Sequence, residues 1–207
     1  MGSISNYTEC FGYLLLAIHM TNPSFPDSSA SRTDASVHYD KKTIWLHWLT
    51  AFLVFGLWIV AHTIDWFPRG TPRVLVRSLH ISAGTLLAGI VLFRIWWRLT
   101  SGAKLPPSAS GMQQTLATLV HLLLYVCVIA TLVIGFGNTW IRGDNIFDLF
   151  RIPAFDPGNK ELRSAAGEWH ELAANILLVL ALAHAAVALA HHYLWKDGIL
   201  RRMLPKQ

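Results

Sequence analysis

The chain contains four stretches that are each predominantly apolar over about twenty residues, the length that a helix needs to cross the hydrocarbon core of a bilayer. They cover roughly Thr43–Ile64, Leu79–Leu99, Thr115–Gly137 and Trp169–Tyr193. Lipid offers no partner to backbone amides and carbonyls, so each stretch must be helical. The links between them are polar, hold Pro and Gly, and are short enough to favour antiparallel neighbours. We therefore predict an all-α fold, a transmembrane four-helix up-and-down bundle.

Composition agrees with this reading, because 53% of the 207 residues are hydrophobic and only 14% are charged, against roughly a quarter in soluble proteins. Lys and Arg near the span ends show a small excess on the side of the two termini, which is the cytoplasmic signature. That side carries nine, which are Lys41, Lys42, Arg94, Arg98, Lys104, Lys196, Arg201, Arg202 and Lys206. The other side carries seven, which are Arg69, Arg73, Arg77, Arg142, Arg151, Lys160 and Arg163. We expect both termini in the cytoplasm, and name the two faces inner and outer accordingly.

Residues 1–38 differ in composition from the rest of the chain and contain no stretch long enough to span a bilayer. Cys10–Met20 is apolar but too short to span a bilayer, and Pro23–Ser36 is rich in Ser, Asp and Pro. We predict a disordered leader over residues 1–38 and a membrane domain over residues 39–207. A signal peptide is the alternative, although the stretch has no basic start and no clear cleavage site.

Four histidines occupy two depths of the predicted bundle. His170 and His184 lie fourteen residues apart on one helix, about 21 Å along its axis and on nearly the same face. In an antiparallel bundle His80 shares the outer level with His170, and His47 shares the inner level with His184. Ionisable residues inside spans are costly and mark functional sites, and haem iron takes two axial imidazoles. The pairing predicts two bis-histidine haem b groups. A single intramembrane histidine, by contrast, is more often an interior polar group whose hydrogen bonds are satisfied.

The cysteine content argues against covalent attachment of haem to the chain. Cys10 and Cys127 are the only two, and no C-x-x-C-H motif occurs, so the haems are expected to be non-covalent. We interpret Cys127, on an apolar helix, as a small core residue.

Other residues near these levels suggest substrate sites. His121 lies at the inner level and could replace either inner ligand; we place it beside the inner haem. A quinone site is predicted beyond His184 at His191, His192, Trp195 and Lys196, where an interfacial polar end with a snorkelling Lys is the alternative. His62 is expected to be interfacial.

Three arginines, Arg69, Arg73 and Arg77, fall on one short outer link with Asp65 as the only nearby acid. Their field would attract a small anion to the outer level. An ordinary solvated basic loop is the alternative.

We expect the lipid bilayer as the surroundings of this chain and no nucleic-acid partner.

From about Tyr39 to the C-terminus the chain resembles the bacterial cytochrome b561 family, especially its superoxide oxidase (superoxide:ubiquinone oxidoreductase) members. The matching stretches are IWLHWL, RSLHISAG, LATLVHLLLY, EWHELAAN and HAAVALAHHYLWKD, which contain the histidines named above. The resemblance implies two haem b groups, with His80 and His170 on the outer one and His47 and His184 on the inner one. It also implies one-electron oxidation of superoxide at the outer face, reduction of ubiquinone at the inner side, and a place in the bacterial inner (plasma) membrane.

Two other classes of function remain open from the sequence. One is a haem b subunit that relays electrons between a partner dehydrogenase or hydrogenase and the quinone pool. The second is a haem-free structural bundle, which the paired histidines disfavour.

Overall fold

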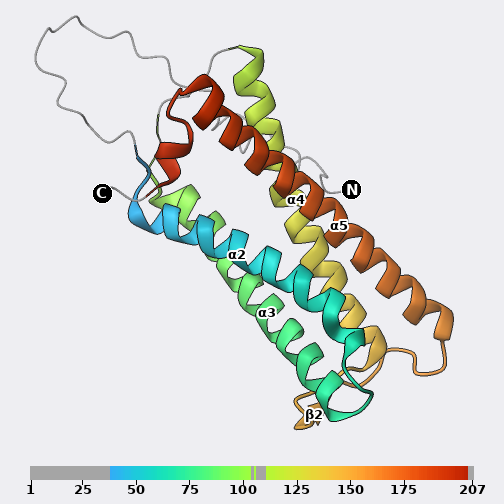
Figure 1. Cartoon of the computed structure of the whole chain (residues 1–207). Helices are drawn as coiled ribbons and strands as arrows, with labels where there is room; N and C mark the ends of the chain where they lie inside the picture. Colours follow the sequence, from blue (N-terminus) through green and yellow to red (C-terminus); the bar gives the residue numbers. More distant parts are fainter. Residues whose placement is uncertain (1–37, 104, 106–110, 205–207) are drawn as a thin grey trace, which may run out of the picture. The chain divides into compact units, whose positions relative to one another are not determined.

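The computed structural model describes residues 38–103, 105 and 111–204 (Figure 1). Its long helices are α2 (Lys41–Thr63), α3 (Thr71–Thr100), α4 (Met112–Arg142) and α5 (Lys160–Ala190). The short elements are η1 (Ile64–Trp66), β1 (Asn145–Ile146), β2 (Phe150–Arg151), η2 (His191–Trp195) and η3 (Leu200–Met203). The predicted leader lies outside the described residues, apart from residue 38.

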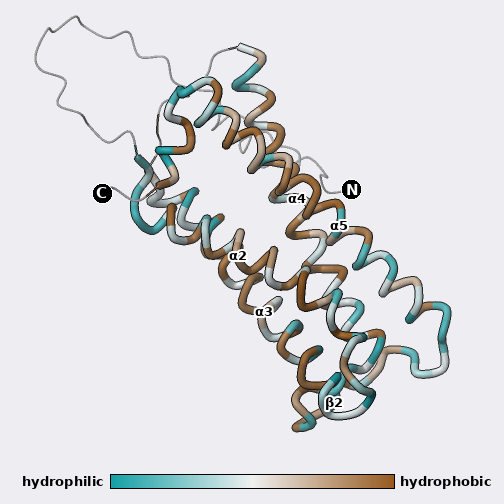
Figure 2. Tube along the Cα trace, in the orientation of Figure 1, coloured by the Kyte–Doolittle hydropathy of each residue, from teal (hydrophilic) through white to brown (hydrophobic). Residues whose placement is uncertain are grey.

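All four long helices are long and apolar enough to cross a membrane, which confirms the predicted four-helix architecture. Apolar residues run along their middle turns and polar residues gather toward their ends (Figure 2). Many large apolar side chains are exposed on these helices, among them Phe52, Leu92, Val133 and Val179. In water such a surface would be an aggregation hazard, whereas in a bilayer it faces lipid.

The helices extend beyond the predicted spans, so the predicted links were too long. α3 begins at Thr71 rather than Leu79, and α5 begins at Lys160 rather than Trp169. Local signals set these starts: Pro72 lies in the first turn of α3, and the Asn159 side chain accepts a hydrogen bond from the Leu162 amide at the start of α5. Apolar windows missed these turns because they carry charged residues.

Helix α2 packs closely on α3, and α4 packs closely on α5; the two pairs meet less extensively, along α2–α5 and α3–α4. A buried cluster of Leu87, Val91, Val128 and Leu177 lies between the pairs, with Cys127 packed against it as predicted. Leu177 is seven residues from both His170 and His184, so this apolar layer lies about 10 Å along the helix from each. The core therefore separates two polar levels.

One end of the bundle, here called the terminal end, joins the start of α2 to η3. The Tyr39 amide donates to the Arg202 carbonyl, and the Trp48 indole donates to the Met203 carbonyl. Asp40 caps α2 through the Thr43 amide and hydroxyl, and it also accepts from the Trp97 indole of α3 and from the amide of Ala103, which follows α3. Burial alone would raise the pKa of Asp40, but these four hydrogen bonds lower it to about 2.

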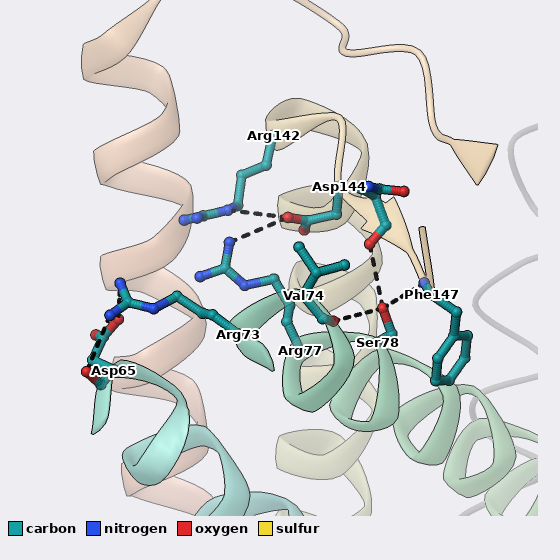
Figure 3. A network of polar contacts seen from close by, with 9 residues as sticks. Asp65, Arg73, Val74, Arg77, Ser78, Arg142, Asp144 and Phe147 are labelled. Carbon is teal, nitrogen blue, oxygen red and sulfur yellow. Dashed lines mark hydrogen bonds and ion pairs between the residues drawn. The ribbon is translucent and has the colours of Figure 1, made fainter. Parts of the chain in front are cut away.

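The opposite end, here called the hairpin end, carries the antiparallel strands β1 and β2. Ser78 of α3 is fully buried; its hydroxyl donates to the Val74 carbonyl and accepts from the Phe147 amide (Figure 3). Phe147 begins the strand-connecting loop with a positive φ of 52°, a conformation that is strained for an aromatic residue. The hydrogen bond from its amide to Ser78 therefore ties the loop to α3.

Candidate functional site: two histidine levels between charged ends

His80 of α3 and His170 of α5 face each other near the hairpin end. Their ring centres are 6.1 Å apart, and the ring planes are almost perpendicular, at 88°. The Nδ1 atoms of both rings are buried and have no hydrogen-bond partner among the described residues. Two imidazoles from different helices thus lie at one level of the bundle, the level at which the sequence analysis had placed them.

Gly135 of α4 makes room for this pair. A Cβ atom at position 135 would lie 2.8 Å from Cε1 of His170, well inside normal contact distance. The missing side chain therefore lets the His170 ring lie against the backbone of α4. Sequence reasoning missed this residue, because a single glycine in an apolar helix is equally consistent with plain close packing.

The second level lies toward the terminal end and holds three histidines. The ring centres of His47 and His184 are 6.4 Å apart, with the planes at 73°. His121 of α4 lies nearer to His184, at 5.2 Å, and its Nδ1 contacts the Ala117 carbonyl of its own helix at 2.7 Å. The structure thus brings together all three histidines that the sequence placed at this level.

Ring separations bear on which pairs fit a shared metal ion. Two imidazoles bound through ring nitrogens at about 2 Å on opposite sides of one ion have centres roughly 6 Å apart. The separations of 6.1 Å for His80–His170 and 6.4 Å for His47–His184 match this value, while 5.2 Å for His121–His184 is short for it. Two axial imidazoles suffice for haem iron, because the porphyrin occupies the other four positions. These residues therefore fit bis-histidine haem ligation.

Arg94 was counted in the sequence only as an inner-side charge. Its guanidinium Nη2 lies 3.1 Å from His47 Nδ1, and its Cζ lies 5.4 Å from the centre of the Tyr125 ring. The terminal-end level therefore contains a cationic side chain in addition to its three histidines.

The hairpin end holds a cationic pocket of about 540 Å³. Seven Lys and Arg residues line it: Arg69, Arg73, Arg77, Arg142, Arg151, Lys160 and Arg163. The sequence had singled out only the first three, because the others come from α4, from β2 and from the start of α5. Folding brings these separate segments to one face.

Two details of the predicted arginine cluster need correction. Arg73 and Arg77 belong to the first two turns of α3, and only Arg69 lies on a link. Asp65 is also not the only nearby acid. It pairs with Arg73 at 3.2 Å, but Asp144 lies 3.4 Å from Arg77 and 3.6 Å from Arg142 (Figure 3). Asp144 is sixty-seven residues from Arg77, so only the tertiary structure reveals the pairing.

Residues after α5 leave the regular helix. Segment η2 forms a wider π-type turn, and Lys196 closes it with a φ of 54°. His191 Nδ1 contacts the Asp197 carboxylate, and its ring centre lies 4.5 Å from that of Trp195. His192 instead lies against Tyr193, with 4.8 Å between ring centres. Sequence analysis did not single out Asp197. In the last turn of α2, His62 is exposed and its Nδ1 contacts the Trp58 carbonyl; its interfacial position stays a prediction.

Several known proteins are similar to this chain over most of its length. Cytochrome b561 homolog 1 of Escherichia coli (strain K12) is 32% identical to the chain over 173 residues, or 82% of this chain and 98% of that protein. Cytochrome b561 homolog 2 of the same strain is 31% identical over 186 residues, or 85% and 96%. Probable superoxide oxidase CybB of Yersinia pestis is 30% identical over 172 residues, or 82% and 97%.

The sequence profile described as Prokaryotic cytochrome b561 matches residues 38–206, which include all four long helices and every histidine of the two levels. The chain therefore belongs to the prokaryotic cytochrome b561 family, whose members are membrane proteins that bind haem b and transfer electrons.

Proposed function

We propose that the chain is a di-haem superoxide:ubiquinone oxidoreductase. The observation that carries the proposal is the presence of two histidine pairs, at two levels of one bundle, each with the ring separation of a bis-imidazole site. His80 and His170 would hold the haem at the hairpin end, and His47 and His184 the haem at the terminal end. When bound, the haems supply one-electron carriers between the two faces of the membrane.

The reaction balances as two superoxide anions plus ubiquinone and two protons giving two dioxygen molecules and ubiquinol. The hairpin end is assigned to the outer face and to superoxide, because its pocket is strongly cationic. Arg69, Arg73 and Arg77 would concentrate the anion there, since a cleft of one charge sign raises the encounter rate of the opposite sign. A relative named probable superoxide oxidase supports this choice of donor.

The terminal end is assigned to ubiquinone and to the cytoplasmic side. His191, Trp195 and Lys196, with His192 beside them, offer aromatic rings and hydrogen-bond donors next to the His47–His184 level. Ubiquinone needs both, because its ring stacks on aromatic side chains and its carbonyl oxygens accept hydrogen bonds. Asp197 would orient His191 through their direct contact.

Haem content tests the ligand assignment. Pyridine haemochrome analysis should give about two haems per chain. His80→Ala and His170→Ala should each remove one haem, and His47→Ala and His184→Ala the other. His121→Ala should keep both, and His62→Ala is the matched control at an exposed histidine. Loss of a haem in His121→Ala together with retention in His47→Ala would show that the terminal-end ligand was assigned wrongly.

Stopped-flow mixing with superoxide tests the donor. Absorbance changes of haem reduction should appear, and they should slow as salt shortens the Debye length from about 10 Å at 0.1 M to about 3 Å at 1 M. Replacing Arg69, Arg73 and Arg77 by Gln should flatten that dependence, whereas Arg201→Gln, outside the pocket, should not. Absence of any superoxide-dependent reduction would favour the alternative, a haem b subunit that receives electrons from a partner dehydrogenase or hydrogenase.

A further inference from the structure

Arg94 places a cation within a membrane-spanning helix. Ionisable residues in such helices are energetically costly and generally mark functional sites. It lies six residues before the end of α3, at the level of His47. Its contacts include a ring nitrogen of His47 and the ring of Tyr125, and neither of these side chains is a carboxylate. No carboxylate lies within 4.0 Å of it among the described residues.

Cations at the other histidine level are differently placed. Arg77, three residues before His80, pairs with Asp144, and Arg73 pairs with Asp65. Arg142 shares Asp144 with Arg77, and the other cations of that pocket lie at the hairpin end of the bundle. Arg94 lies beside His47, and no carboxylate of the described residues pairs with its charge; in a low-dielectric span, electrostatic effects are strongest.

We propose that the fixed positive charge of Arg94 raises the reduction potential of the haem held by His47 and His184, and so favours electron transfer toward the terminal end. An electron added at that level brings a negative charge close to the guanidinium, which stabilises the reduced form. The charge carries the effect rather than one hydrogen bond, because the guanidinium stays protonated whichever nitrogen of His47 bears the proton. The inference rests on the proposed placement of a haem at this level.

An equilibrium redox titration of the purified holoprotein, followed by haem absorbance, tests the proposal without any turnover assay. The terminal-end component is identified as the one that remains in His80→Ala and vanishes in His184→Ala. In Arg94→Gln its reduced-to-oxidised ratio at a fixed ambient potential should fall about tenfold, which corresponds to 59 mV for a one-electron centre. The hairpin-end component should not move.

Two further variants separate charge from shape. Arg94→Lys keeps the charge and should keep the potential close to that of the parent. Arg98→Gln removes a cation one turn away, over the Tyr39 ring, and is the matched control that should leave both potentials unchanged. An equal shift in Arg98→Gln would mean that general surface charge, rather than Arg94, sets the potential.

An unchanged potential in Arg94→Gln overturns the inference and leaves the proposed function intact. If Arg94→Gln loses the terminal-end haem, Arg94→Lys decides: a retained haem at the parental potential supports the role of charge. A lost haem or a tenfold lower ratio in Arg94→Lys refutes it. A parent protein with no component that depends on His184 would instead refute the proposed haem placement itself.

Discussion

Replacing Gly135 by Ala should damage the His80–His170 level, although Ala is the better helix former. The added Cβ would lie 2.8 Å from Cε1 and 3.2 Å from Nδ1 of His170. Carbon atoms in contact normally stay about 3.5 Å apart or more, so the ring must move by about 0.7 Å or turn. Overpacking of this kind costs about 1–3 kcal/mol, which outweighs the gain of about 1 kcal/mol in helix propensity.

Gly137 provides the matched control, because it lies on the same helix and a Cβ there meets nothing within 4 Å. Gly137→Ala should therefore show only the propensity gain, about 1 kcal/mol of added stability. Thermal unfolding in detergent and haem content would be measured for both variants. Gly135→Ala should unfold at a lower temperature than Gly137→Ala and lose, or hold more weakly, the haem that depends on His170. Equal stability and equal haem spectra in the two variants would refute the role assigned to Gly135.

Substitutions at three other residues probe the ends of the bundle. Asp40→Ala should cost about 0.5–2 kcal/mol in thermal unfolding, since it removes the α2 cap. Because the folded-state pKa of Asp40 is lowered from 3.8 to about 2, its carboxylate stabilises the fold above pH 3.8 and loses that effect as pH falls toward 2. Asp40→Asn should therefore unfold with a weaker acid dependence, and an unchanged acid transition would contradict this. Ser78→Ala leaves the Phe147 amide without its acceptor and should cost about 1–3 kcal/mol, measured by chemical or thermal unfolding. Asp197→Asn removes the ionised partner of His191 and should raise the KM for ubiquinone while haem spectra stay unchanged; parental quinone kinetics would move the acceptor site elsewhere.

Sequence alone determined the architecture and the vertical order of the histidines. Backbone groups in lipid must be satisfied within each span, so four apolar stretches permit only four helices. The rise of about 1.5 Å per residue then fixes depth, which is why the sequence alone matches His80 with His170 and His47 with His184. The same reasoning could not choose between His47 and His121, since depth carries no information about lateral distance.

Tertiary structure decided everything that depends on contacts between distant segments. The ring separations from His184, 6.4 Å for His47 and 5.2 Å for His121, both depend on how α2 and α4 pack around α5. The pairing of Arg77 with Asp144, the seven-cation pocket and the fit of His170 against Gly135 likewise join residues far apart in the chain. Hydropathy and helical period describe one helix at a time, and these features arise only where helices and loops meet.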